Sequence, residues 1–234
     1  MRFFKEESLE LSIVLPCLNE GDALGYSIRE ARRFITRKGI RGEIIVVDNG
    51  SSDDSPSIAL SRKALLLSED RRGYGYAIRK GLRYSRGRVI VIADSDSTYD
   101  LLHLDDYFYP LMENRADFVI GNRFVGRTER FAMPLSHRLG SSFLSTLARI
   151  RFRTGVRDFH CGLRAIRREA LEKLDFRTGG MEFATEFVAL CARKGFRIGQ
   201  VACGLRRCRF KRRSKLNIVR DGFRHLKYIV SASP

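Results

Sequence analysis

Residues 89–100 read VIVIADSDSTYD, and this stretch decides the fold class. The apolar run predicts a buried strand, and Asp94 and Asp96 follow it on one turn. Two carboxylates at the end of a buried strand repel each other and lose hydration, so they need a compensating cation. Oxygen ligands of this kind suit Mg²⁺ or Mn²⁺, which also bind substrate phosphates. An isolated Asp-x-Asp is more often a solvated turn, but its position here favours a metal site.

Short apolar runs rich in β-branched residues precede and follow this strand and alternate with segments of helical period. This alternation predicts an α/β fold with a mainly parallel sheet flanked by helices. Strands are expected at residues 11–15, 44–47, 64–67, 89–92, 118–120 and 196–201. Helices are expected before Gly39, after Ser55 as an N-cap followed by Pro56, up to Tyr84, and over residues 136–150 and 181–194.

Two other expected strands also end in polar residues. Asp48 ends EIIVVD before the small loop Asn49-Gly50-Ser51-Ser52, and the first strand ends with Pro16, Asn19 and Glu20. Open α/β sheets bind ligands at the carboxyl ends of their strands, where Asp48 can accept hydrogen bonds from a base or ribose. The alternative is that Asp48 and Asp53 only cap the next helix. Three strand ends with carboxylates at one edge favour a binding site.

Three arginines lie in loop-like or small-residue settings: Arg123 in GNRF, Arg138 in SHR and Arg164 in DFHCGLR. The planar guanidinium matches phosphate, so these side chains are candidates to bind a diphosphate or an acceptor phosphate. For each one alone, a surface ion pair is the alternative. His160 and Cys161 are adjacent but have no acidic or amide partner at a recognisable spacing, so we expect no Cys/His nucleophile.

The charge of the chain is strongly positive: 44 Lys and Arg against 27 Asp and Glu give +17. Residues 203–234 carry ten of these bases and one acid. Polyanions, phosphorylated small molecules and anionic membranes are the natural partners of such a chain. Residues 217–230 form an amphipathic pattern that fits either a helix on a membrane surface or a helix docked on the domain with a solvated basic face. We therefore expect two parts, a catalytic domain over residues 1–202 and a basic amphipathic segment over residues 203–234.

The five cysteines contain no Cys-x-x-Cys pair, which argues against a disulfide framework or a structural zinc site and favours a reducing compartment. We find no signal peptide and no run of ~18 apolar residues. The expected location is cytoplasmic, peripheral on the cytoplasmic face of a membrane.

Eight motifs in this order resemble the family 2 glycosyltransferases, in the branch of dolichyl-phosphate mannose and glucose synthases. They are IVLPCLNE, IIVVDNGSSDDS, RRGYGYAIRKGL, VIVIADSDSTYD, GNRF, DFHCGLR, MEFATEF and KRRSKLN. The resemblance implies a GT-A fold, a Rossmann-like nucleotide-sugar-binding domain with a mixed, mainly parallel sheet. It implies that the nucleotide is bound by Pro16, Glu20, Asp48 and Asp94, and Mg²⁺ or Mn²⁺ by Asp94 and Asp96. It implies catalytic roles for Asp96, Arg123 and Arg138, and contacts to the acceptor phosphate from Arg164, Ser214 and Lys215.

This sequence departs from the family pattern at three positions. Thr98 stands where mannose synthases commonly have a glutamine, Asn49 replaces the second aspartate of an Asp-Asp pair, and Leu18 replaces a frequent tyrosine. The donor nucleotide and sugar therefore stay open.

The resemblance implies inverting transfer of a hexose from a nucleotide sugar, of the UDP-glucose or GDP-mannose type, to a dolichyl or undecaprenyl phosphate. A phosphate acceptor is already anionic at pH 7, so no strong general base is required. A soluble or polysaccharide acceptor is the alternative. A nucleic-acid-binding module, suggested by RRCRFKRRSK at residues 206–215, is disfavoured because carboxylates at three strand ends would repel a phosphate backbone.

Overall fold

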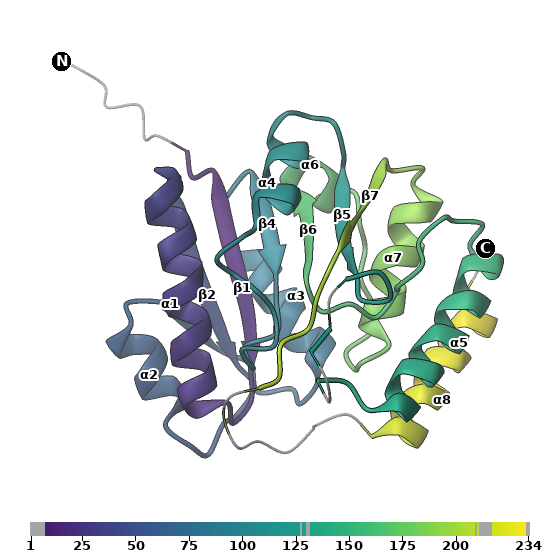
Figure 1. The fold of residues 1–234 in the computed structure, drawn as a ribbon, viewed down its shortest axis with the longest axis horizontal. Helices are drawn as coiled ribbons and strands as arrows, with labels where there is room; N and C mark the ends of the chain where they lie inside the picture. Colours follow the sequence, from purple (N-terminus) through teal and green to yellow (C-terminus); the bar gives the residue numbers. More distant parts are fainter. Residues whose placement is uncertain (1–7, 127, 130–131, 209, 211–216, 233–234) are drawn as a thin grey trace.

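The computed structural model describes residues 8–126, 128–129, 132–208, 210 and 217–232. Within them, seven strands form one sheet in the order β3-β2-β1-β4-β6-β5-β7 (Figure 1). The strands are β1 Leu11–Cys17, β2 Gly42–Asp48, β3 Leu65–Ser68, β4 Val89–Ile92, β5 Phe118–Asn122, β6 Arg164–Arg167 and β7 Ile198–Ala202. β6 runs antiparallel to β4 and β5, and the other pairings are parallel. The expected mixed, mainly parallel sheet is confirmed.

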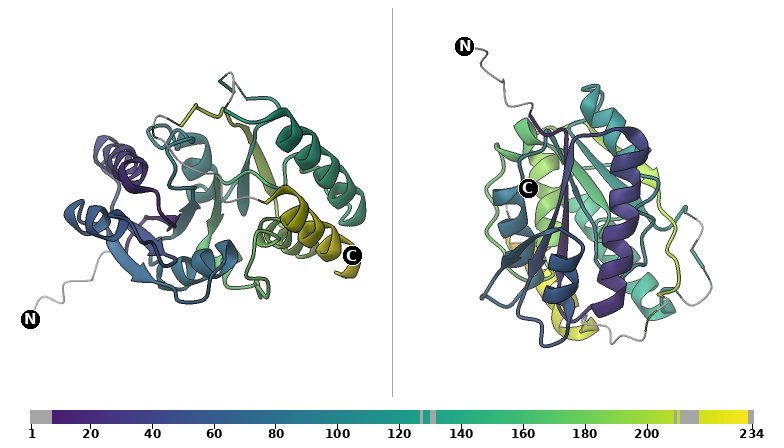
Figure 2. Two further views of the ribbon diagram at one scale, coloured as in Figure 1. Left: turned by 90° about the horizontal axis from the view of Figure 1, so that it is seen from below. Right: turned by 90° about the vertical axis from the view of Figure 1, so that its left-hand side faces the viewer.

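Helices cover both faces of this sheet (Figure 2). They are α1 Gly21–Lys38, α2 Ser55–Ser61, α3 Tyr74–Tyr84, α4 Asp105–Met112, α5 Leu135–Arg151, α6 Arg168–Leu171, α7 Phe183–Arg193 and α8 Ile218–Ser231. α1 and α4 share one face, where the rings of Phe34 and Phe108 meet with centroids 6.5 Å apart. α3 and α7 pack side by side on the other face. α5 and α8 lie together beyond the end of the sheet that β7 forms.

The core explains why these segments become strands and helices. β4 is buried along its whole length, which matches its unbroken apolar sequence. Gly39 adopts φ 64° and ends α1, as its sequence position predicts. Every expected strand and helix is present to within a few residues, and β6, α4 and α6 are additional. None of the described helices has the length and apolar character needed to cross a bilayer.

The expected N-cap role of Ser55 is wrong by one residue. Asp54 occupies the N-cap position of α2, and Ser55 is already helical. Its hydroxyl instead accepts hydrogen bonds from the backbone N–H groups of Glu20 and Gly21, at 3.0 and 2.9 Å. Ser55 therefore ties the start of α1 to the start of α2, which holds the two loops after β1 and β2 together.

Candidate active site

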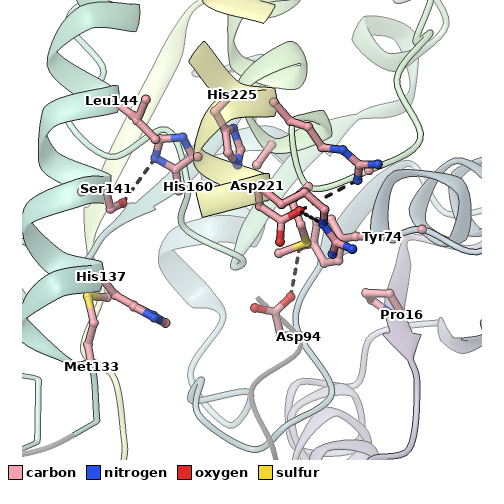
Figure 3. A pocket seen from close by; sticks show the side chains of 18 of the residues that line it. Pro16, Tyr74, Asp94, Met133, His137, Ser141, Leu144, His160, Asp221 and His225 are labelled. Carbon is pink, nitrogen blue, oxygen red and sulfur yellow. Dashed lines mark hydrogen bonds and ion pairs between the residues drawn. The ribbon is translucent and has the colours of Figure 1, made fainter. Parts of the chain in front are cut away.

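The carboxyl ends of β1, β2 and β4 open into a pocket of about 990 Å³ (Figure 3). Pro16 lies on one side of this pocket, Tyr74 and Asp94 lie at its centre, and α5 forms the opposite wall. Residues from many parts of the chain line it, among them Pro16, Asn49, Asp94, Arg123 and Arg164. Four residues that the sequence singled out, Pro16, Asp94, Arg123 and Arg164, thus line one pocket.

The loop after β2 forms the wall near Pro16. Asp48 is buried, and its carboxylate accepts hydrogen bonds from the backbone N–H groups of Gly50 and Ser51 at 3.1 and 3.2 Å. The side-chain amide of Asn49 donates to the carbonyl oxygens of Glu69 and Arg71 and accepts from the Gly73 N–H at 2.8 Å. Asn49 therefore joins the loop after β2 to the loop after β3. Asp48 shapes this loop, and Asn49 itself lines the pocket.

Glu20 is at the N-cap position of α1, outside the set of side chains that line the pocket. The Glu20 N–H donates a hydrogen bond to the Ser55 hydroxyl, and this bond fixes the position of Glu20. The structure thus puts Glu20 next to the loop after β2 without bringing it into the pocket wall.

Asp94 and Asp96 occupy the turn after β4, as predicted. The Tyr74 hydroxyl donates to Asp94 Oδ1 at 3.0 Å, and burial together with the Asp94 charge raises the pKa of Tyr74, which keeps the phenol a donor. A Cβ atom added to Gly162 would lie 2.2 Å from Asp94 Oδ2, so glycine lets the backbone before β6 approach this carboxylate closely. Asp94 lines the pocket, and Asp96 lies behind it, 6% exposed.

The residues of this turn fit a divalent cation held jointly with a ligand. Among the described residues, no group of three or more His, Cys, Asp or Glu side chains forms a complete metal cage. Two carboxylates with room for a diphosphate are the donor set that Mg²⁺ and Mn²⁺ use when phosphate oxygens complete the shell. Asp94 and Asp96 would hold such a cation.

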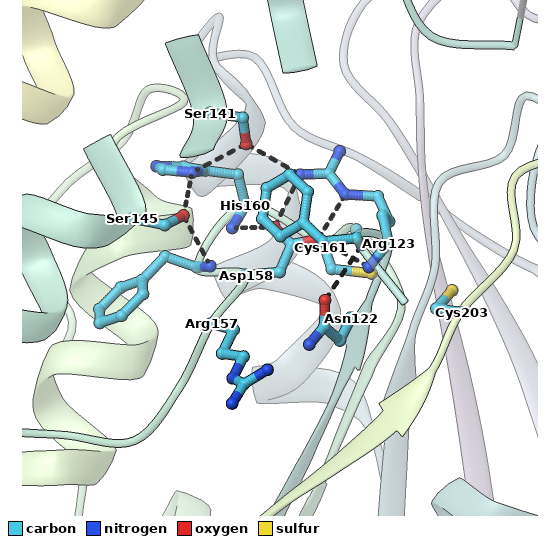
Figure 4. A network of polar contacts seen from close by, with 12 residues as sticks. Asn122, Arg123, Ser141, Ser145, Arg157, Asp158, His160, Cys161 and Cys203 are labelled. Carbon is cyan, nitrogen blue, oxygen red and sulfur yellow. Dashed lines mark hydrogen bonds and ion pairs between the residues drawn. The ribbon is translucent and has the colours of Figure 1, made fainter. Parts of the chain in front are cut away.

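Arg123 is fixed by a buried ion pair (Figure 4). Asp158, fully buried, accepts hydrogen bonds from Arg123 Nε at 2.7 Å, from Nη2 at 2.8 Å and from the Arg123 backbone N–H at 3.0 Å. Burial alone would lower the pKa of Arg123. The charge and hydrogen bonds of Asp158 outweigh this effect, so the pKa of Arg123 is raised. Arg123 Nη2 also donates to the Ser141 hydroxyl of α5 at 3.1 Å. This pairing presents a permanently charged guanidinium to the pocket.

Arg164 is a second buried cation at the pocket. Its side chain is fully buried and donates to the carbonyl oxygens of Cys161, at 2.6 Å, and Ala184, at 3.4 Å. Its Nε has no partner, and no carboxylate within the described part of the chain forms an ion pair with it. The guanidinium also lies over the ring of Phe187, 5.7 Å from its centroid. A buried cation balanced by carbonyl dipoles and an aromatic ring, without a carboxylate, favours an anion nearby.

Two histidines line the pocket between α5, α7 and α8. The Thr185 hydroxyl lies 2.7 Å from His225 Nδ1 and 3.3 Å from His160 Nε2. Burial lowers the pKa of both rings, that of His225 to about 4. Both imidazoles are therefore neutral at pH 7.

The remaining predicted residues are placed elsewhere or lie outside the described residues. Arg138 is exposed on α5 and is not among the side chains that line the pocket. Ser214 and Lys215 lie outside the described residues. Sequence reasoning did not identify Tyr74 or Asp158. The only available signal was their presence in the motifs RRGYGYAIRKGL and DFHCGLR.

Comparisons with known proteins identify the family to which the chain belongs. The family model described as "Glycosyl transferase family 2" matches residues 12–175. The chain is 30% identical over 227 residues to the low-salt glycan biosynthesis hexosyltransferase Agl6 of Haloferax volcanii, covering 96% of this chain and 54% of Agl6. It is also 30% identical over 192 residues to the dolichyl-phosphate hexose transferase of that organism, covering 82% and 81%. The chain thus spans about half the length of Agl6.

A solved structure supports the fold. Glucosyl-3-phosphoglycerate synthase from Mycobacterium tuberculosis, in complex with Mn²⁺, UDP and glucosyl-3-phosphoglycerate, aligns with a TM-score of 0.74 at 24% identity, covering 95% of this chain and 78% of that chain. The expected GT-A architecture is confirmed. With the family model matching residues 12–175, the chain belongs to glycosyl transferase family 2 and resembles its dolichyl-phosphate sugar synthase-like branch.

Proposed function

We propose that this protein transfers a hexose from a nucleotide sugar to a polyprenyl phosphate at the cytoplasmic face of an anionic membrane, with inversion at the anomeric carbon. The observation that carries this proposal is the make-up of the pocket. It runs from Asp94, past Arg123 and Arg164, to the apolar side chains of Phe143 on α5 and Phe223 on α8. A donor diphosphate, an acceptor phosphate and an apolar chain would each meet matching chemistry there.

The outward faces of α5 and α8 support a membrane partner. On α5, Leu135, Leu139, Phe143 and Ile150 are exposed, and on α8, Val219, Phe223, Leu226 and Val230. α8 buries Asp221 and His225 and leaves these four apolar side chains exposed. Exposed apolar side chains gathered on two neighbouring helices indicate an interaction surface.

Basic residues lie on the same two helices. Arg138 on α5 and Arg220, Arg224 and Lys227 on α8 are exposed. Each base near an anionic bilayer contributes about 1 kcal/mol to binding before screening by salt. α8 packs on α5 and α7 and still exposes apolar side chains. A helix docked on the domain and a helix lying on a membrane surface are therefore compatible in α8.

The chemistry needs little from the protein beyond charge and position. The acceptor phosphate is anionic at pH 7, so the two neutral histidines need not act as bases. Arg123, held rigid by Asp158, would stabilise the charge that grows on the leaving diphosphate. A divalent cation bound by Asp94 and Asp96 would neutralise part of the same charge. Arg164 would hold the acceptor phosphate in line with the anomeric carbon.

Radiolabelled UDP-glucose or GDP-mannose tests this proposal. With Mn²⁺ and a polyprenyl phosphate, we expect label from one donor to enter the organic phase, and we expect EDTA or Asp94→Asn to abolish this transfer. Asp22→Asn, which removes an exposed carboxylate from α1, is the matched control and should retain activity. Label that reaches only a soluble phosphorylated acceptor or a polysaccharide would establish the soluble-acceptor alternative instead.

A further inference from the structure

The turn formed by residues 94–98, the Asp turn, is held in a conformation that needs support. Ser97 has φ 64°, in the left-handed region that residues other than glycine rarely adopt. A turn of this kind persists when surrounding contacts determine it. Its side chains are nearly all buried, including Ser95, Asp96, Ser97 and Thr98.

Thr98 makes the most direct contact to a carboxylate of this turn. Its hydroxyl donates to Asp96 Oδ1 at 2.5 Å, and its backbone N–H donates to the same oxygen at 3.0 Å. An oxygen that accepts two hydrogen bonds has both lone pairs engaged. The two hydrogen bonds from Thr98 thus fix the orientation of the Asp96 carboxylate.

Other parts of the chain fix Thr98 and the turn in place. The Arg206 N–H donates to the Thr98 carbonyl oxygen at 2.9 Å. The guanidinium of Arg206 pairs with Glu30 Oε1 of α1 at 2.7 Å and with Asp100 Oδ2 at 2.6 Å. The Ser95 hydroxyl donates to the Pro16 carbonyl oxygen at 2.7 Å. The turn is thus tied to β1, to α1 and to the segment that follows β7.

We propose that Thr98 is a positioning residue for the cation site. Its hydroxyl and backbone N–H orient the Asp96 carboxylate, and Thr98 itself is not a ligand. This inference rests on the proposed function, because it takes Asp94 and Asp96 as the cation-binding pair. Hydrogen-bond partners of metal-binding carboxylates commonly change metal affinity by tenfold or more when removed.

The test is the affinity for Mn²⁺, measured by calorimetry on protein saturated with the nucleoside diphosphate that binds best. Thr98→Val keeps the shape and removes the hydroxyl, and we expect it to weaken Mn²⁺ binding about tenfold. Thr98→Ser restores the donor and should stay within about twofold of the native protein, as rescue by the conservative variant. Thr146→Val is the matched control, because Thr146 is an exposed threonine on α5, and its Mn²⁺ affinity should not change.

Two results would overturn the inference. Native Mn²⁺ affinity in Thr98→Val would show that the hydroxyl does not orient Asp96. Equal weakening in Thr98→Ser and Thr98→Val would show that packing, and not the hydrogen bond, is responsible. If Thr98→Val does not fold, Thr98→Ala against Thr98→Ser makes the same comparison.

The native protein separates this inference from the proposed function. Mn²⁺ binding with no transfer to polyprenyl phosphate would contradict the proposed acceptor and leave the Thr98 comparison valid. Absence of any Mn²⁺ binding to a native protein that still transfers the hexose to polyprenyl phosphate would overturn the Thr98 inference and leave the proposed acceptor in place.

Discussion

Asp158 is a single buried residue that fixes Arg123, the arginine that we propose to be catalytic. It is fully buried and binds Arg123 through both carboxylate oxygens, and the Arg123 side chain is only 12% exposed. Breaking a buried pair by removing one partner's charge typically costs about 3–5 kcal/mol, because the other charge is left uncompensated.

We therefore expect Asp158→Asn to lower the free energy of unfolding by about 3 kcal/mol and to reduce kcat for transfer by at least about tenfold. Urea unfolding and a transfer assay measure the two effects. The control is Asp175→Asn, which removes an ion pair to Arg177 whose side chains are 80% and 84% exposed, and which should change stability by less than about 1 kcal/mol. Native stability and kcat in Asp158→Asn would contradict the role given to this pair.

His225 makes stability depend on pH. Burial lowers its pKa to about 4, against the opposing effect of Asp221, whereas in the unfolded chain it titrates near 6.5. Between these values the unfolded chain binds more protons than the folded one. The contribution of His225 to stability is therefore complete above about pH 6.5 and is lost as the pH falls towards 4.

Urea unfolding of the native protein and of His225→Asn at pH 7 and at pH 4.5 checks this. We expect the native protein to lose about 2 kcal/mol more than the variant over this range. His103→Gln, at a ring that is 62% exposed, should behave as the native protein does. The same pH dependence in native protein and His225→Asn would rule out His225 as the cause.

Among single residues, the sequence identified charged side chains whose position at a strand end or in a motif indicates ligand binding. Asp94, Arg123 and Arg164 stand at strand ends or in small-residue motifs, and all three line the pocket. Asp158 and Tyr74 could not be found in this way. Their roles depend on contacts to residues 35 and 20 positions away, which no local pattern records.

For helices, the hydrophobic period predicted the location of each helix more accurately than the side of the helix that is buried. Residues 217–230 were expected to be an amphipathic helix, and α8 is one. The pattern put Val219, Phe223 and Ile229 on one apolar side, yet Ile229 is buried and the other two are exposed. The helix turns part of its apolar side outwards because Asp221 and His225 face the domain.

This orientation predicts a separation of membrane binding from stability. Phe143→Glu together with Phe223→Glu should greatly weaken sedimentation with anionic liposomes and change the melting temperature little, since the two side chains are 61% and 67% exposed. Leu60→Glu on α2, at a side chain that is 60% exposed, is the matched control and should bind liposomes normally. Unchanged sedimentation of the double variant would contradict the membrane role of α5 and α8.

β6 was missed because it does not look like a strand. Residues 164–167 read RAIR, which lacks the apolar run that marks the other central strands. It lies between β4 and β5 all the same, and Arg164 is buried there because it faces the pocket. A buried arginine that lines the pocket thus stands where the local pattern requires an apolar residue.

At the scale of the whole molecule, the alternation of strands and helices was sufficient to predict an α/β fold with a mainly parallel sheet. The antiparallel insertion of β6 between β4 and β5 was not predictable, because strand order depends on long-range pairing. That insertion pairs Arg164 with Ile92, the last residue of β4 before the turn that carries Asp94 and Asp96. Residues at the carboxyl ends of the strands and residues of α5 and α8 therefore line one pocket only in the folded chain.

The class of acceptor is tested by the ratio of two values of kcat/KM, one for a prenyl phosphate and one for a small soluble phosphate. kcat/KM is measured with one donor for a short, water-soluble prenyl phosphate and for 3-phosphoglycerate, in the same buffer with Mn²⁺. We expect a kcat/KM for the prenyl phosphate at least about a hundredfold higher, because only a prenyl chain would meet the apolar side chains of α5 and α8. Equal values, or a preference for 3-phosphoglycerate, would contradict it.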